Sequence, residues 1–141
     1  MPFITKQYEF SAAHRYWNEK WSENENRNMF GKDIYLHGHN YLLDITIFGL
    51  VNETSGFIIN LEKLDYLVNK HIIKVLDHSH VEKDINWFID HQPSTENIVI
   101  FIWKQIADKI PQPAKLHSIK LRETSDIYTE YFGPERNNDK N

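Results

Sequence analysis

The 141-residue chain contains no cysteine. This absence excludes disulfide bonds, a thiolate nucleophile and sulfur-ligated zinc, so metal ligands would have to be imidazoles or carboxylates. The chain also lacks any apolar run of the length that spans a bilayer, and its N-terminus lacks the charged and then apolar segments of a secretory signal. We therefore expect a cytoplasmic protein that makes no membrane contact.

Positive charge is also sparse. Lys and Arg total 16 against 20 Asp and Glu, which gives a formal net charge of -4, and the basic residues form no run. We therefore expect no nucleic-acid partner and favour a small-molecule substrate. The length and the 40% hydrophobic content suit one domain with a real core. We assign this domain to residues 1–133 and the polar segment 134–141 to a C-terminal tail.

Three histidines indicate a metal site. His37 and His39 begin an alternating, strand-like run, and side chains two apart on a strand point to the same face. His14 ends another strand-like run, residues 3–13. Histidines on strands are often surface or core residues, but three imidazoles with an open fourth position are a common catalytic zinc arrangement. We predict zinc rather than iron or copper, because nothing in the sequence indicates redox chemistry.

The order of elements predicts an α+β fold. We expect an antiparallel four-stranded sheet with two helices on one face, in the order ββααββ. The other face of this sheet would need a partner, so we expect a homo-oligomer. The expected strands are residues 3–13, 36–50, 117–123 and 127–132, the expected helices are residues 61–76 after an Asn60 cap and residues 95–109, and residues 16–28 are expected to form a loop.

Three further residues are candidates for chemistry. Glu123 shares a strand face with apolar neighbours, so its carboxylate needs a partner such as a ligand with N–H donors, although a glutamate at a wet strand end is equally compatible with the pattern. Asp77 and His78 fall where a helix should stop. They suit either an oriented general acid or base, or a histidine that stabilises a helix C-terminus.

Five short motifs resemble the 6-pyruvoyl-tetrahydropterin synthase and 6-carboxytetrahydropterin synthase family. This resemblance implies a zinc-dependent lyase that acts on dihydroneopterin triphosphate. It also implies the tunnelling fold, in which trimeric barrels stack as hexamers. The motifs are Phe10-Ser11-Ala12-Ala13-His14, His37-Gly38-His39-Asn40-Tyr41, Leu76-Asp77-His78, Pro93-Ser94-Thr95-Glu96-Asn97 and Glu123-Thr124.

The same resemblance implies roles for individual residues. The three histidines would bind zinc, and Asp77 and His78 would be the catalytic pair. Glu123 would anchor the amino and ring N–H groups of the pterin, with Thr95 nearby. The site would lie between subunits, and Glu123 would come from a different subunit than the zinc.

Asp33 marks a departure from the family. Members normally carry a catalytic cysteine at this position, and a variant with glutamate one residue later is not matched either, because this chain has Ile34 there. Asp33 has three possible roles: a base, a fourth zinc ligand or an inert loop residue. An aspartate is a weaker base than a thiolate unless it is desolvated.

Two functions follow from these predictions. The first is a zinc-dependent pterin lyase or synthase. The alternative is a pterin- or purine-binding oligomer with little or no turnover, because the catalytic cysteine is absent.

Overall fold

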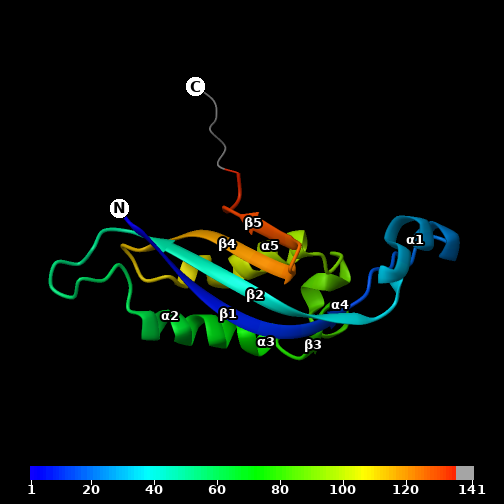
Figure 1. The fold of residues 1–141 in the computed structure, drawn as a ribbon, viewed down its shortest axis with the longest axis horizontal. Helices are drawn as coiled ribbons and strands as arrows, with labels where there is room; N and C mark the ends of the chain where they lie inside the picture. Colours follow the sequence, from blue (N-terminus) through cyan, green and yellow to red (C-terminus); the bar gives the residue numbers. More distant parts are fainter. Residues whose placement is uncertain (136–141) are drawn as a thin grey trace, which may run out of the picture.

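A computed structural model describes residues 1–135 of the chain. It shows one β-sheet with helices packed on one face, and the short helix α1 projects beyond the end of the sheet (Figure 1). The fold is therefore α+β, as predicted. The strands, in the sheet order β3-β1-β2-β4-β5, are β1 (Phe3–His14), β2 (His37–Phe48), β3 (Ser79–His80), β4 (Lys115–Thr124) and β5 (Ile127–Tyr131).

The long hairpin of β1 and β2 is the frame of the sheet. The two strands pair antiparallel over their whole length, from Phe3 opposite Phe48 to His14 opposite His37. β4 pairs antiparallel with β2, and β5 pairs antiparallel with β4. These three antiparallel pairings agree with the sequence prediction.

The prediction of a purely antiparallel four-stranded sheet is wrong. β3 is a fifth strand, and it pairs in parallel with β1 through Ala12 and Ala13. The sheet is therefore mixed. A two-residue strand carries no alternation of polar and apolar residues, so sequence periodicity gives no sign of it.

Two long helical segments cover the sheet, as predicted. The first continues from α2 into a π-helical turn and α3, and the second, α5, ends in a 3-10 turn. No helix within residues 1–135 is long and apolar enough to span a membrane. The segments are α2 (Leu61–Val68), the π turn (Asn69–Ile73), α3 (Lys74–Leu76), α4 (Val81–Asp84), a 3-10 helix (Asn86–Ile89), α5 (Thr95–Ile106) and its 3-10 turn (Ala107–Lys109).

The loop predicted for residues 16–28 is in part a helix. The helix α1 (Glu23–Phe30) is capped by Ser22, whose side chain accepts a hydrogen bond from the backbone N–H of Glu25, and a 3-10 turn (Gly31–Ile34) follows it. Within α1 only Asn26 is buried. A helix that buries one polar residue has no apolar stripe, which explains why the pattern favoured a loop.

The hydrophobic core lies between the sheet and the helices. On β2, every second side chain from Tyr41 to Ile47 is fully buried, and Ile119 and Leu121 continue this face on β4. The helices contribute Leu64 and Ile102, among others. The two-residue repeat of apolar side chains on the strands therefore determines which face of the sheet is buried.

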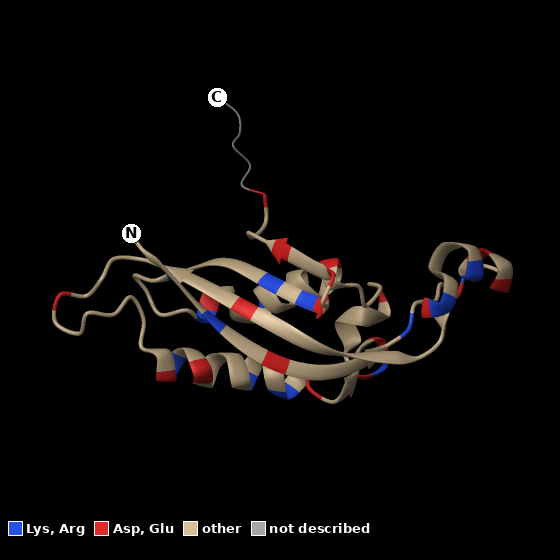
Figure 2. Ribbon diagram, viewed as in Figure 1, with Lys and Arg blue, Asp and Glu red and all other residues tan. Residues whose placement is uncertain are grey.

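The other face of the sheet is mainly polar. Its side chains bond across the strands: Thr5 to Thr46 at 2.7 Å, and Ser11 to Asn40 at 2.6 Å. Figure 2 shows basic and acidic residues interspersed over the ribbon. Most of this face therefore needs no apolar cover, which removes the reason given above for expecting an oligomer. Of the proposed tail 134–141, residues 136–141 lie outside the described residues.

Asn60 begins the first helical segment, and its side chain accepts a hydrogen bond from the backbone N–H of Lys63 at 3.1 Å. We expect Asn60→Ala to lower the free energy of unfolding by about 1 kcal/mol, because it leaves that N–H without a partner. Asn60→Asp should keep the stability, since a carboxylate also caps a helix N-terminus. Denaturant titration of the three proteins measures this. Equal losses in both variants would contradict the capping role.

Candidate metal centre

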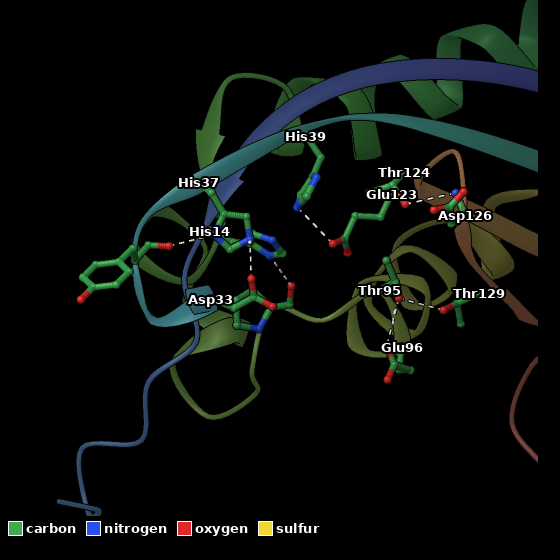
Figure 3. A network of polar contacts seen from close by, with 12 residues as sticks. His14, Asp33, His37, His39, Thr95, Glu96, Glu123, Thr124, Asp126 and Thr129 are labelled. Atoms are coloured by element: carbon green, nitrogen blue, oxygen red, sulfur yellow. Dashed lines mark hydrogen bonds and ion pairs between the residues drawn. The ribbon is translucent and has the colours of Figure 1, made fainter. Parts of the chain in front are cut away.

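His14, His37 and His39 meet at one end of the β1–β2 hairpin. His14 and His37 are directly opposite each other, and His39 follows two residues later on the same face. The ring centroids are 4.5 Å apart for His14 and His37, and 5.1 Å apart for the other two pairs. Each ring offers a ligand atom within 4.8 Å of the others (Figure 3). The structure thus brings the three predicted histidines together.

The backbone packs closely at this point. Gly38, between two of the histidines, lies against β1, where an added Cβ would be 3.2 Å from the carbonyl oxygen of Ala12. A side chain at this position would push the strands apart. Glycine therefore keeps the rings of His37 and His39 close to that of His14.

Hydrogen bonds orient two of the imidazoles. Nδ1 of His14 lies 2.7 Å from the carbonyl oxygen of Pro93, and Nδ1 of His37 lies 2.8 Å from that of Tyr35. A carbonyl oxygen only accepts, so in both rings Nδ1 carries the proton and Nε2 is left with a lone pair. Nε2 of His14 is buried and has no hydrogen-bond partner within the described chain. A buried unpartnered nitrogen of this kind fits a divalent metal ion.

The electrostatics favour the neutral ligand form. Burial lowers the pKa of His14 to about 4, and the other two histidines add to the effect, while the bond to Pro93 opposes it. Burial also lowers the pKa of His39. Imidazoles must be neutral to bind a metal, so His14 and His39 need not lose a proton for this near pH 7.

Asp33 lies at the edge of this cluster. Its Oδ1 is 3.7 Å from Nε2 of His37, and its side chain is 58% exposed. Its backbone is held in place by a hydrogen bond from the N–H of Tyr16 to its carbonyl oxygen at 2.9 Å. The 3.7 Å separation is too long for a hydrogen bond. The position agrees with each of the three roles, a base, a fourth ligand or an inert loop residue.

Glu123 ends β4 beside the histidines. Its Oε1 is 3.0 Å from Nε2 of His39, and its side chain is only 14% exposed. Burial raises the pKa of Glu123, which His37 opposes and the charges of Asp33 and Glu96 reinforce. The expectation that Glu123 comes from a different subunit than the metal site is therefore wrong: both belong to one chain, because β4 pairs with the strand that carries His39.

Thr95 lies next to Glu123 (Figure 3). It is buried, its hydroxyl donates to Oε1 of Glu96 at 2.9 Å, and it shares a 2.8 Å hydrogen bond with the hydroxyl of Thr129. Sequence reasoning missed Glu96, whose charge acts on Glu123. The sequence feature that could have identified Glu96 is its position directly after Thr95, at the start of a predicted helix.

Asp77 and His78 form a pair, but not at the histidine cluster. Asp77 accepts hydrogen bonds from the N–H of Ser11 at 2.9 Å and from Nδ1 of His78 at 2.9 Å. His78 has a backbone φ of 61° and a side chain that is 83% exposed. It lines a groove of about 370 Å³ together with Ser11, Asn40 and His39. No hydrogen bond or ion pair within residues 1–135 joins the Asp77–His78 pair to the three imidazoles.

Tyr41 is a second residue that sequence reasoning missed. Its side chain is fully buried on the same face as His39, with the ring centroids 5.6 Å apart. Its hydroxyl has no hydrogen-bond partner within residues 1–135. The sequence feature that could have identified Tyr41 is the two-residue alternation that runs from His37 through His39 to Tyr41.

Residues 3–134 match the family model described as 6-pyruvoyl tetrahydropterin synthase. The chain belongs to this family. It is 34% identical over 134 residues to the 6-pyruvoyl tetrahydrobiopterin synthase of Drosophila melanogaster, covering 94% of this chain and 80% of that protein. The solved 6-pyruvoyl tetrahydropterin synthase of Caenorhabditis elegans superposes with a TM-score of 0.86 at 32% identity, covering 95% of this chain and 98% of that one.

Relatives of this chain do not all carry one name. The Dihydroneopterin monophosphate aldolase of Pyrococcus furiosus is 30% identical over 121 residues, which covers 86% of this chain and 89% of that protein. The family assignment therefore establishes a lyase-type protein of pterin biosynthesis, and it leaves the reaction to be argued from the site.

Replacing one imidazole should weaken metal binding in this synthase-family chain. We expect His37→Ala to lower zinc affinity by more than about a hundredfold, because even the loss of a group that only orients a ligand costs about 10- to 100-fold. Competition with a chromophoric chelator measures the affinity. His91→Ala is the matched control, since His91 stacks on Trp87 outside the cluster. One equivalent of zinc held with unchanged affinity in His37→Ala would exclude the site.

Proposed function

We propose that the protein is a zinc-dependent lyase of the 6-pyruvoyl- or 6-carboxytetrahydropterin synthase type, and that it acts on a dihydroneopterin derivative such as the triphosphate. The observation that carries this proposal is the cluster of His14, His37 and His39, with its buried unpartnered nitrogen, beside the carboxylate of Glu123.

The three histidines would hold the ion through nitrogens. Nε2 is the free nitrogen in His14 and His37, because Nδ1 of each donates to a backbone carbonyl. Bound zinc would supply Lewis acidity toward the side-chain hydroxyls of the substrate, which makes a nearby proton easier to remove.

Glu123 would bind the pterin ring. It is largely buried beside His39, and a desolvated carboxylate requires N–H donors, which the amino group and ring nitrogen of a pterin offer. Thr95 and Glu96 lie next to it and line the same side of the site. The ring would therefore sit toward β4, with its side chain toward the histidines.

Asp33 would move a proton. Its Oδ1 lies 3.7 Å from Nε2 of His37, and its side chain is exposed. A carboxylate accepts a proton best once a bound ligand has removed water from it. Two reactions remain to be distinguished, elimination of triphosphate and cleavage of the side chain, and the second suits the name of the aldolase relative.

Asp77 and His78 would complete the site from a neighbouring subunit. The pair is pre-formed, since the backbone of Ser11 holds Asp77 and Asp77 holds His78, yet within residues 1–135 no hydrogen bond or ion pair joins it to the histidine cluster of its own chain. Both sheet edges offer backbone groups for assembly, because β3 covers β1 only at Ala12 and Ala13, and β5 pairs only with β4 within the described chain. These features support a trimeric or hexameric homo-oligomer.

Asp33→Ala should lower kcat/KM for dihydroneopterin triphosphate by about a hundredfold or more if Asp33 transfers a proton. Mass spectrometry of the products identifies which bond is broken. Asp33→Cys introduces the residue that family members normally carry, and we expect it to retain turnover. Asp90→Ala, which changes another exposed aspartate, is the control.

The second candidate function is a pterin-binding oligomer with little turnover. The exposure of Asp33 favours it, because a solvated carboxylate is a poor base. Tight binding of dihydroneopterin triphosphate by the zinc-loaded protein without any product would establish this function and exclude the lyase.

Mixing two inactive variants tests whether the site is shared between subunits. We expect His37→Ala and His78→Ala to be inactive alone, and a refolded equimolar mixture to recover about a quarter of the wild-type activity, because random assembly then pairs intact halves at that frequency. Mixing His37→Ala with His39→Ala should recover none, since both changes fall in one half. No recovery in the first mixture would place the reaction within one chain.

A further inference from the structure

We propose that Tyr41 is a positioning residue for the pterin site: its buried hydroxyl donates a hydrogen bond to the carboxylate of Glu123 once a metal ion has taken the nitrogen of His39. This inference rests on the proposed function, because the role of Glu123 as the pterin anchor belongs to that proposal.

The first observation is an unpaired donor. The hydroxyl of Tyr41 is buried and has no partner within residues 1–135, and the whole residue is 0% exposed. The ring is fixed between Phe10, which stacks on it at 4.8 Å, and His39 at 5.6 Å. A buried hydroxyl without a partner is costly, so a partner is expected in the functional state.

The second observation is that the acceptor is a cross-strand neighbour. Leu43 pairs with Leu121 and Leu42 with Arg122, and the next residues in the same direction are Tyr41 on β2 and Glu123 on β4, where β4 is irregular between Arg122 and Thr124. Both side chains lie on the helix-covered face. Burial and the charge of Glu123 both raise the pKa of the Tyr41 phenol. The hydroxyl therefore keeps its proton and can donate it in a hydrogen bond.

The third observation is that Glu123 has fewer polar partners than the other carboxylate near Tyr41. Glu82, whose charge also reaches Tyr41, already contacts His80 and accepts from the N–H of Arg15. Within residues 1–135 the Glu123 carboxylate has one close polar contact, with Nε2 of His39 at 3.0 Å. A metal ion on that nitrogen would remove the contact. The hydroxyl of Tyr41 would then hold one carboxylate oxygen and leave the other to the ligand.

Tyr41→Phe removes only this oxygen. We expect it to raise the Kd of the zinc-loaded protein for 7,8-dihydroneopterin about tenfold, the loss that a hydrogen bond to a charged group produces, and to leave zinc affinity unchanged. Tyr8→Phe is the matched control. Tyr8 donates to Asp65 at 2.8 Å, so its loss should lower stability without changing the Kd.

A double-mutant cycle on the zinc-loaded protein tests the contact without using a pterin. The unfolding equilibrium constants of wild type, Tyr41→Phe, Glu123→Ala and the double variant should show a coupling of about fivefold or more, as expected for a direct hydrogen bond. Additive effects would overturn the proposal.

The two measurements separate the possible failures. A wild-type protein that does not bind 7,8-dihydroneopterin contradicts the proposed function, and the cycle then still decides whether Tyr41 contacts Glu123. A wild type that binds the pterin while Tyr41→Phe binds it equally well excludes the positioning role.

Discussion

The antiparallel register of β1 and β2 is the constraint on which the site depends. It places His14 opposite His37, and the two-residue repeat of a strand then turns His39 toward the same point. A shift by one residue would move all the rings of one strand to the polar face. The buried apolar residues from Tyr41 to Ile47 prevent such a shift, because they would enter water with it. The core and the metal centre are thus specified by the same alternation.

The site gathers polar groups that residues 1–135 do not satisfy among themselves. Within these residues, Nε2 of His14 and the hydroxyl of Tyr41 are both buried without partners, and Glu123 is a largely buried carboxylate beside an imidazole. Each such group costs free energy that the surrounding core must offset. Metal and ligand binding would satisfy them together. This explains why the chain keeps them in a region that could otherwise pack apolar side chains.

Much of this arrangement could be predicted from the sequence, because periodicity and capping are local. The shared face of His37 and His39, the Asn60 cap and the alternation within the long strands follow from residues close together in the chain. The helix α1 and the strand β3 could not be predicted in this way. The first buries only Asn26, and the second is two residues long, so neither produces an apolar pattern. Glu96 and Tyr41 lay within the noted motifs, but their importance depends on which groups they face.

The sequence by itself determined the chemistry available: eight imidazoles, 20 side-chain carboxylates and no thiol. It also determined that His37 and His39 share a face, since this depends only on strand geometry. Tertiary structure alone decided that Glu123 adjoins the histidines of its own chain, and that the Asp77–His78 pair is held by the backbone of Ser11 rather than by that cluster. These relations depend on which strands are neighbours in the sheet and on which sheet edge the 77–80 segment lies against. Both involve residues far apart in the chain, so no local sequence pattern predicts them.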